Sequence, residues 1–215
     1  MSFHYSVARS AISVAIGAVT GWEVRGRERV PMSGSLIIAS NHVSYADPLM
    51  VGAATRRELH FLAKQELFRV PLLGLMIASV NSIPIRRGMA DLTGMSRAIE
   101  VLKRGEGLLV FPEGTRSRDG ELHPARPGIG MLAIASDATI LPAYVSGSDR
   151  PNEWITRRTR VRVWFGVARP WKDFVSPETD LTPGRPLYQS VGDAVMREIA
   201  VLRTGQLTSA SRGAA

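Results

Sequence analysis

The 215-residue chain contains no cysteine, four histidines and three lysines. Without cysteine, the protein cannot form disulfides, metal sites with thiolate ligands or a cysteine nucleophile. Four scattered histidines leave little material for a histidine metal cluster, so we expect no bound metal. Any catalytic chemistry must therefore rest on His, Asp, Glu, Ser or Arg side chains.

The chain also lacks a long, uninterrupted apolar run. A membrane-spanning helix needs about 20 predominantly apolar residues. The longest stretches without Asp, Glu, Lys or Arg, 30–46 and 70–85, are both broken by Pro, Gly, Ser or Asn. We therefore predict no clear transmembrane helix.

Residues 1–22 form a weakly amphipathic, mostly apolar segment that carries a single arginine, Arg9. We interpret it as a retained helix that lies at the bilayer interface. Two alternatives stay open. One is an ordinary helix packed on the domain, and the other is a signal peptide, for which no obvious cleavage site followed by a linker is present.

Basic residues exceed acidic ones, and almost all of them are arginine. The chain has 24 arginines and a formal net charge of +8 at pH 7. Such a charge indicates an anionic partner, which is a nucleic acid, a phosphorylated small molecule or an acidic lipid surface. Arginine suits bidentate contacts with phosphate, although a biased genome produces the same excess. Composition alone does not choose among these partners.

Strand-like and helix-like apolar patterns alternate along the chain with short connections. This alternation predicts a single α/β domain with a largely parallel, mixed central sheet flanked by helices. We expect the domain to span 23–204, between the interfacial helix at 1–22 and a flexible C-terminal tail at 205–215. The expected strands are 35–40, 59–63, 81–87, 108–111, 139–145 and 161–165, and the expected helices are 48–55, 65–80 with a break at Pro71, 92–104, 128–136 and 187–202.

The last expected strand, 161–165, alternates apolar residues with arginine and tryptophan. One face of this strand should be buried and the other should be basic. We therefore place it at an edge of the sheet.

The first candidate site is Asn41-His42-Val43-Ser44-Tyr45-Ala46-Asp47, where a strand gives way to a helix. Ligand and catalytic groups collect at the carboxyl ends of strands in such sheets. His42 can act as a general base because its reference pKa is about 6.5, and Asp47 can fix its tautomer. Five residues correspond to ~140° around a helix, so contact requires His42 before the helix and Asp47 in its first turn. No enzyme nucleophile is evident beside them, so the base would act on a substrate hydroxyl.

Two further candidates follow strands. In Phe111-Pro112-Glu113-Gly114-Thr115-Arg116-Ser117, Glu113 lies at the rim of the sheet and Arg116 can pair with it or bind a phosphate. The alternative is a surface turn with a local ion pair. In the segment 83–88, Arg86 and Arg87 end a strand, and only one of them can point to a given face.

These segments, in this order and at these separations, resemble the 1-acylglycerol-3-phosphate acyltransferase family of membrane-peripheral glycerolipid acyltransferases. The family motif Asn-His-x-x-x-x-Asp matches Asn41, His42 and Asp47, and Phe-Pro-Glu-Gly-Thr-Arg-Ser matches 111–117 without a mismatch. By this resemblance Arg87 would be the family's phosphate-binding arginine. The family commonly has Asp at the position before it, where this chain has an arginine.

The resemblance implies an activity. His42 would remove the proton from the free hydroxyl of 1-acyl-sn-glycerol-3-phosphate while that oxygen attacks an acyl thioester, which gives phosphatidic acid in phospholipid biosynthesis. Asp47 would orient His42. The acceptor would be bound by Arg87, Glu113, Gly114, Thr115 and Arg116.

The same resemblance implies substrates, partners and a location. The acyl donor would be acyl-CoA or acyl-ACP, used as a co-substrate, with no metal and no other cofactor. The partners would be the lysophospholipid, the acyl thioester, an anionic membrane surface and, as a further candidate, acyl carrier protein. The protein would lie at the cytoplasmic face of the cell membrane, peripheral or monotopic.

Two alternatives stay open. The first is an acyltransferase that acts on another lysolipid, such as a lyso-ornithine lipid or lysocardiolipin. The second is a non-catalytic basic protein that binds anionic membranes or nucleic acid, although charge binding alone does not need His42, Asp47 and Glu113. No nucleic-acid-binding motif is evident, so we expect no nucleic acid partner. Of the other histidines, we expect His60 to be structural and His123 to be an exposed loop residue.

Overall fold

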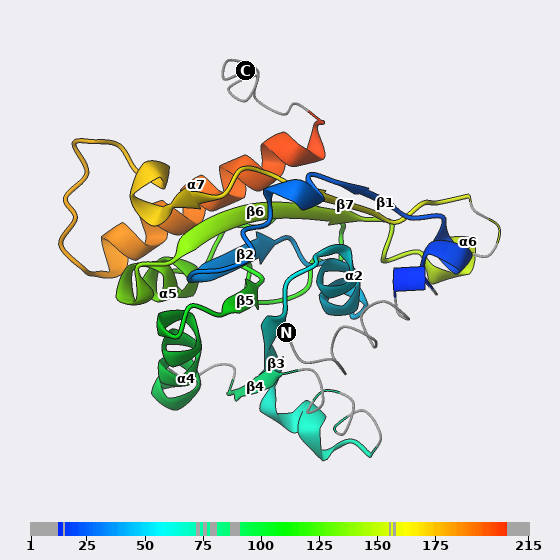
Figure 1. Cartoon of the computed structure of the whole chain (residues 1–215), viewed down its shortest axis with the longest axis horizontal. Helices are drawn as coiled ribbons and strands as arrows, with labels where there is room; N and C mark the ends of the chain where they lie inside the picture. The colour runs from blue at the N-terminus through cyan, green and yellow to red at the C-terminus, as the bar shows by residue number, and fades with distance from the viewer. Residues whose placement is uncertain are drawn as a thin grey trace.

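A computed structural model describes residues 13–14, 16–71, 74, 77, 81–86, 91–154, 156 and 158–205 of the chain. Among these residues, eight strands form one mixed sheet (Figure 1). The strands are β1 (Glu23–Arg25), β2 (Leu36–Ser40), β3 (Leu59–Lys64), β4 (Ser82–Ile85), β5 (Gly107–Val110), β6 (Thr139–Ser146), β7 (Arg162–Phe165) and β8 (Arg169–Pro170). This arrangement confirms the predicted fold class.

The order across the sheet is β1-β7-β6-β2-β5-β3-β4, with β8 paired to β6. Neighbours from β6 through β4 pair in parallel, whereas β7 and β8 each pair antiparallel to β6. The carboxyl ends of β2, β5 and β6 therefore meet at one edge of the sheet. This edge is where the loops that follow those strands come together.

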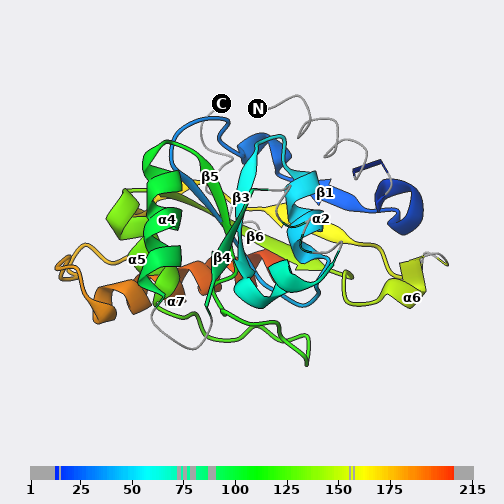
Figure 2. The same cartoon turned by 90° about the horizontal axis from the view of Figure 1, so that it is seen from below.

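Helices cover both faces of the sheet (Figures 1 and 2). One face packs against α4 (Leu92–Lys103), α5 (Gly128–Ser136) and α7 (Arg185–Arg203), and the other packs against α2 (Asp47–Ala54). The remaining short elements are η1 (Arg27–Arg29), η2 (Gln65–Arg69), α6 (Pro151–Trp154) and η3 (Trp171–Phe174). Because both faces are covered, the central strands are apolar at successive positions, as in β2, where residues 36–40 are all fully buried.

The ends of α4 match the prediction. The Asp91 side chain accepts a hydrogen bond from the Gly94 N–H at 3.0 Å, which caps the helix start. After the helix, Gly105 adopts a φ of 77°, the left-handed conformation that glycine tolerates and that commonly ends helices. The same carboxylate also accepts the Arg86 N–H at 2.7 Å, so this cap joins α4 to the end of β4.

The prediction that 161–165 is an edge strand is wrong. β1 pairs in parallel with β7, with Val24 opposite Val163, so β7 lies inside the sheet and β1 is the outer strand. An alternating pattern reports which face of a strand is buried, but it does not report whether another strand lies alongside. The three residues of β1 are too short to produce a period-2 signal of their own.

Other predicted segments changed type or lie outside the described residues. The start of the expected helix 65–80 is the 3₁₀-helix η2, and most of its apolar second half lies outside the described residues. Residues 13–14 and 16–20 of the expected N-terminal helix are helical, whereas the tail beyond 205 lies outside the description. Each helix in the described ranges is too short or too polar to cross a bilayer.

A buried arginine ties together the amino ends of the central strands. The Arg57 side chain, only 5% exposed as a residue, donates through Nη1 to the carbonyls of Pro31 at 2.8 Å and Ser33 at 3.0 Å. Its Nη2 donates to the carbonyls of Gly105 at 2.9 Å and Gly34. Burial lowers the pKa of this guanidinium below its ordinary value. The contacts satisfy carbonyls in the loops that lead into β2 and β5, at the end of the sheet opposite the candidate site.

Replacing Arg57 by lysine should lower the free energy of unfolding by at least about 2 kcal/mol, because the three N–H groups on one ammonium nitrogen cannot satisfy the four carbonyls that the guanidinium bonds. Urea denaturation measures the change. The neighbouring Arg56 is exposed, so Arg56→Lys is a matched control that should change this free energy by less than about 0.5 kcal/mol. Equal losses in the two variants would contradict the role assigned to Arg57.

Candidate active site

The loop after β2 is held in place by Asn41. Its Nδ2 donates to the Val145 carbonyl at 2.9 Å, and its Oδ1 accepts the Val145 N–H at 2.8 Å. Asn41 is 2% exposed, so this pair of hydrogen bonds is shielded from water. The side chain thereby extends the pairing of β2 with β6 by one residue and fixes the path of the backbone into His42.

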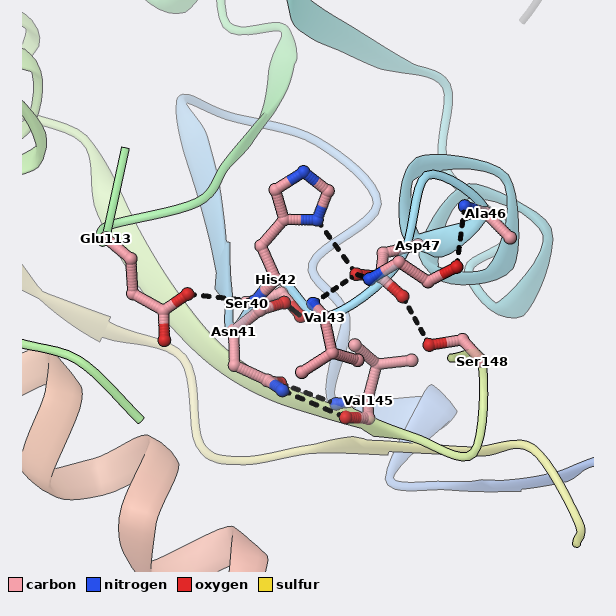
Figure 3. A network of polar contacts seen from close by, with 10 residues as sticks. Ser40, Asn41, His42, Val43, Ala46, Asp47, Glu113, Val145 and Ser148 are labelled. Atoms are coloured by element: carbon pink, nitrogen blue, oxygen red, sulfur yellow. Dashed lines mark hydrogen bonds and ion pairs between the residues drawn. The ribbon is translucent and has the colours of Figure 1, made fainter. Parts of the chain in front are cut away.

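His42 and Asp47 are in contact, in the arrangement that their spacing requires for contact (Figure 3). His42 Nδ1 lies 2.8 Å from Asp47 Oδ2, with His42 in the loop and Asp47 as the first residue of α2. A carboxylate only accepts hydrogen bonds, so it selects the tautomer in which Nδ1 carries the proton. The other ring nitrogen, Nε2, points away from Asp47 and keeps its lone pair (Figure 3).

Asp47 is fully buried, and both of its oxygens accept hydrogen bonds. Besides His42, Oδ2 accepts the N–H groups of Val43 and Ser44, each at 2.7 Å. Oδ1 accepts the hydroxyl of Ser148 at 2.5 Å, and Ser148 is only 1% exposed. Ser148 lies just beyond β6 and 101 positions from Asp47, so no local pattern in the sequence indicated it.

The turn that follows β5 is joined to the His42 loop. The Ser117 N–H donates to the His42 carbonyl at 2.7 Å, and the Phe111 ring stacks on the imidazole with centroids 4.0 Å apart. Glu113 accepts the His42 N–H through Oε2 and the His123 N–H through Oε1, both at 3.2 Å. These contacts bring the two predicted motifs together, and they restrict the imidazole from one face while Asp47 restricts it from its edge.

Glu113 is 3% exposed, and burial raises the pKa of its carboxyl above the ordinary value. The backbone N–H groups of His123 and His42 oppose this effect but are smaller causes. Glu113 therefore shapes the site by holding two loops. Its two oxygens are both engaged by backbone donors of the protein itself.

Glycine is needed at position 114. Gly114 has a φ of 71°, and its N–H donates to the Phe111 carbonyl at 3.0 Å to close the turn. A Cβ at this position would lie 2.6 Å from Cδ of Arg126, whose Nε donates to the Glu113 carbonyl at 3.3 Å. The tight turn places Thr115 and Arg116 beyond it, toward solvent.

An open pocket of about 420 Å³ adjoins this turn and is lined by Thr115, Arg116, Arg118, Asp119 and His123. The Ser117 hydroxyl, followed by the Glu121 N–H and the His123 ring, holds the pKa of Asp119 at about 2. Asp119 is thus ionised and already has hydrogen-bond donors. The two arginines and the threonine give the pocket groups that bind an anion.

The structure brings together six of the seven predicted site residues, which are His42, Asp47, Glu113, Gly114, Thr115 and Arg116. Arg87 lies outside the described residues. His60 lies in β3, where its Nε2 pairs with Glu106 Oε2 at 2.6 Å and not with any of these site residues. Within the described ranges, no group of three or more His, Asp or Glu side chains is placed to hold a metal ion.

Comparisons with known proteins agree on one family. The family model described as Acyltransferase matches residues 21–146. The chloroplastic 1-acyl-sn-glycerol-3-phosphate acyltransferase BAT2 of Brassica napus is 26% identical over 151 residues, which cover 69% of this chain and 44% of that protein. The lyso-ornithine lipid O-acyltransferase of Pseudomonas aeruginosa is 33% identical over 130 residues, which cover 60% of this chain and 49% of that protein.

Solved structures also share the fold. Among them is the crystal structure of the 1-acyl-sn-glycerophosphate (LPA) acyltransferase PlsC from Thermotoga maritima, with a TM-score of 0.67 and 24% sequence identity. The match covers 94% of this chain and 84% of that one. By contrast, the chain spans about half the length of the two curated relatives, 44% and 49%.

The buried carboxyl of Glu113 should make stability depend on pH with a definite sign. Its pKa is higher in the folded state than in the unfolded state, so the folded state binds the extra proton between these values. Stability should therefore fall as pH rises from about 4.5 through the raised pKa, relative to Glu113→Gln, which has no such proton. Urea denaturation of both proteins across this pH range measures the difference.

The matched control is Glu178→Gln. The Ser176 hydroxyl lowers the pKa of Glu178, so the wild type should gain stability relative to this variant as pH rises through the lowered pKa to about 4.5, just below the range in which Glu113 acts. Removing the Glu113 carboxylate also changes the free energy of unfolding by an amount that does not depend on pH. The comparison uses only the slope of the stability difference against pH, so this constant amount does not affect it. A flat difference for Glu113→Gln would mean that its carboxyl is not desolvated in the folded protein.

Proposed function

Because the chain belongs to the acyltransferase family, we propose that it transfers a fatty acyl group from an acyl thioester to the free hydroxyl of 1-acyl-sn-glycerol-3-phosphate, giving phosphatidic acid. The observation that carries the proposal is the buried contact between His42 and Asp47, which leaves Nε2 of the imidazole able to accept a proton. A hydroxyl is a weak nucleophile, and a positioned base raises its reactivity by about 100-fold or more.

In the proposed reaction, His42 Nε2 takes the proton of the acceptor hydroxyl while that oxygen forms a bond to the thioester carbonyl carbon. Asp47 stabilises the imidazolium that results. When the carbon–sulfur bond breaks, the sulfur leaves with the electron pair and takes the proton from Nε2. The products are the new ester and a free thiol, and the protein returns to its starting state without a covalent intermediate.

The acceptor phosphate is proposed to bind in the pocket beside the turn. Thr115 and Arg116 line this pocket, while Glu113 and Gly114 shape the turn that presents them. A guanidinium forms paired hydrogen bonds with phosphate oxygens. We further propose that Arg87 contributes to the same anion site, that the donor is acyl-CoA or acyl-ACP, and that no other cofactor takes part.

The protein is proposed to work at the cytoplasmic face of the cell membrane on an anionic surface. The net charge of +8 supports attraction to acidic lipids. Two apolar side chains of the N-terminal helix, Val14 and Val19, are 73% and 45% exposed, and such residues suit the bilayer interface. Acyl carrier protein, itself a donor of acyl groups, is a proposed partner in place of coenzyme A.

A second acceptor is favoured by a specific observation. The relative from Pseudomonas aeruginosa is named as a lyso-ornithine lipid O-acyltransferase. Its acceptor carries no phosphate but has a hydroxyl, so the same base serves both reactions. The two candidates differ in whether the pocket arginines contribute to acceptor binding.

Replacing His42 by alanine should reduce thiol release by at least about 100-fold, because the variant lacks the proposed base for the acceptor hydroxyl. The assay uses vesicles that contain lysophosphatidic acid, an acyl-CoA, and a thiol reagent. His60→Ala is a matched control that should keep its activity, since His60 pairs with Glu106 instead. Full activity of the His42 variant, with an unchanged circular dichroism spectrum, would exclude His42 as the base.

An acceptor panel tests the substrate in the same assay. Turnover of lysophosphatidic acid, but not of lyso-ornithine lipid, supports the first candidate, and the reverse supports the second. Binding to acidic vesicles with no thiol release for any acceptor or donor would contradict both. If the acceptor is lysophosphatidic acid, Arg116→Ala should weaken the affinity for the acceptor. This loss is expected only for the first candidate, because the acceptor of the second carries no phosphate.

Ser148→Ala should lower kcat by about tenfold with little change in KM, because Asp47 loses a buried donor and holds His42 less firmly. Ser136→Ala is the matched control, because Ser136 has a buried hydroxyl bonded to the Leu132 carbonyl within α5. If Ser148→Ala and Ser136→Ala change kcat and KM alike, Ser148 has no positioning role.

A further inference from the structure

We propose that Tyr45 is a positioning residue that holds the Arg116 guanidinium ready for a phosphate group. Tyr45 lies between His42 and Asp47 in sequence, at a position that the family motif leaves open. The proposed function is needed only to say which substrate carries the phosphate. The binding of phosphate at Arg116 is inferred from the structure without it.

The two side chains are stacked. Cζ of Arg116 lies 3.5 Å from the centroid of the Tyr45 ring, well inside the distance at which a guanidinium is attracted to an aromatic face. Tyr45 is 75% exposed, so it does not serve to fill the core. An exposed tyrosine with one face covered by an arginine is arranged to hold that arginine.

The ring is presented by a rigid loop. Asp47 accepts the N–H groups of Val43 and Ser44, and the Ser44 hydroxyl accepts the Ala46 N–H at 3.2 Å. Both neighbours of Tyr45 are thus fixed by hydrogen bonds. From the other side, the Ser117 N–H donates to the His42 carbonyl, which fixes the residue next to Arg116. The stack therefore joins two segments whose backbones are already bonded to each other.

Stacking leaves the donors of the guanidinium available. Among the residues that the structure describes, the Arg116 side chain makes no hydrogen bond and no ion pair. Arg203, by comparison, is held by two hydrogen bonds to Glu121 at 2.7 and 3.0 Å, which use donors from both of its terminal nitrogens. An aromatic ring restricts a guanidinium from its face, so the N–H groups at its edge remain free for a bidentate contact with phosphate.

The surrounding pocket has the chemistry of a phosphate site. Thr115 and Arg118 line it with Arg116, and Asp119 is the acidic group on its wall. The Asp119 carboxylate accepts hydrogen bonds from the Ser117 hydroxyl at 2.7 Å and the Glu121 N–H at 3.0 Å, and its Oδ1 also lies 3.0 Å from Nε2 of His123. Its negative charge is therefore partly offset within the pocket wall. A phosphate of the acceptor and the 3′-phosphate of coenzyme A share this chemistry.

The first experiment measures binding without catalysis. Calorimetric titration with sn-glycerol 3-phosphate should show affinity about threefold to tenfold weaker in Tyr45→Ala, the range expected for loss of one cation–π contact. Tyr45→Phe should bind within about twofold of the wild type, because phenylalanine keeps the aromatic face. The double variant Tyr45→Ala with Arg116→Ala should bind no more weakly than Arg116→Ala alone, since the tyrosine acts through the arginine.

Arg25→Ala is the matched control for Arg116→Ala. Arg25 is another surface guanidinium over an aromatic ring, 5.2 Å from the centroid of Trp164, and its loss should leave glycerol 3-phosphate binding unchanged. Three results would overturn the inference: unchanged affinity in Tyr45→Ala, failure of Tyr45→Phe to restore it, or additive losses in the double variant. A loss in Arg25→Ala equal to that in Arg116→Ala would also overturn it, because the contribution of Arg116 would then be one of net charge and the tyrosine would have no specific arginine to position.

The second experiment assigns the phosphate. In Tyr45→Ala, a higher KM for lysophosphatidic acid with unchanged kcat supports the positioning role and assigns the phosphate to the acceptor. If KM rises for acyl-CoA but not for 3′-dephospho-acyl-CoA, the positioning role is supported and the phosphate belongs to the donor. If no acceptor is turned over while glycerol 3-phosphate binding still depends on Tyr45, the proposed function fails and this inference stands.

Discussion

The site depends on one buried carboxylate. Asp47 has no exposed surface, and an ionised group in such a place is costly unless its hydrogen bonds are complete. Its partners come from the loop that it terminates, from the imidazole and from Ser148 beyond β6. Its position at the amino end of α2 adds the favourable field of the helix dipole. The conformation of the whole 42–47 loop follows from satisfying this single charge.

The parallel centre of the sheet determines which loops can meet at that carboxylate. β2 lies between β5 and β6 and runs in the same direction as both, so all three carboxyl ends share one edge. The His42 loop, the turn at Glu113 and the Ser148 segment leave from these ends. Asn41 and Glu113 then bond the loops to one another, and Arg57 holds the opposite ends of the strands. The framework is rigid, so the imidazole is held from its face and its edge.

The sequence predicted much of this arrangement because the signals were local. Continuous apolar runs marked the central strands, and the Asp91 cap and Gly105 marked the ends of α4. Spacing and helix geometry stated where His42 and Asp47 must lie to be in contact, and the two motifs identified the family. The outer strand β1 was missed and β7 was misplaced as an edge, because pairing between strands far apart in the chain leaves no trace in a short pattern.

By itself, the sequence determined the α/β class, the positions of the central elements, the candidate pair of His42 and Asp47, and the acyltransferase resemblance. Only the tertiary structure decided that Ser148 completes the hydrogen bonds of Asp47, that Glu113 holds loops with both of its oxygens, and that Tyr45 stacks on Arg116. The reason is physical. Composition and periodicity depend on neighbours along the chain, whereas each of these contacts exists only after distant strand ends have been brought to the same edge of the sheet.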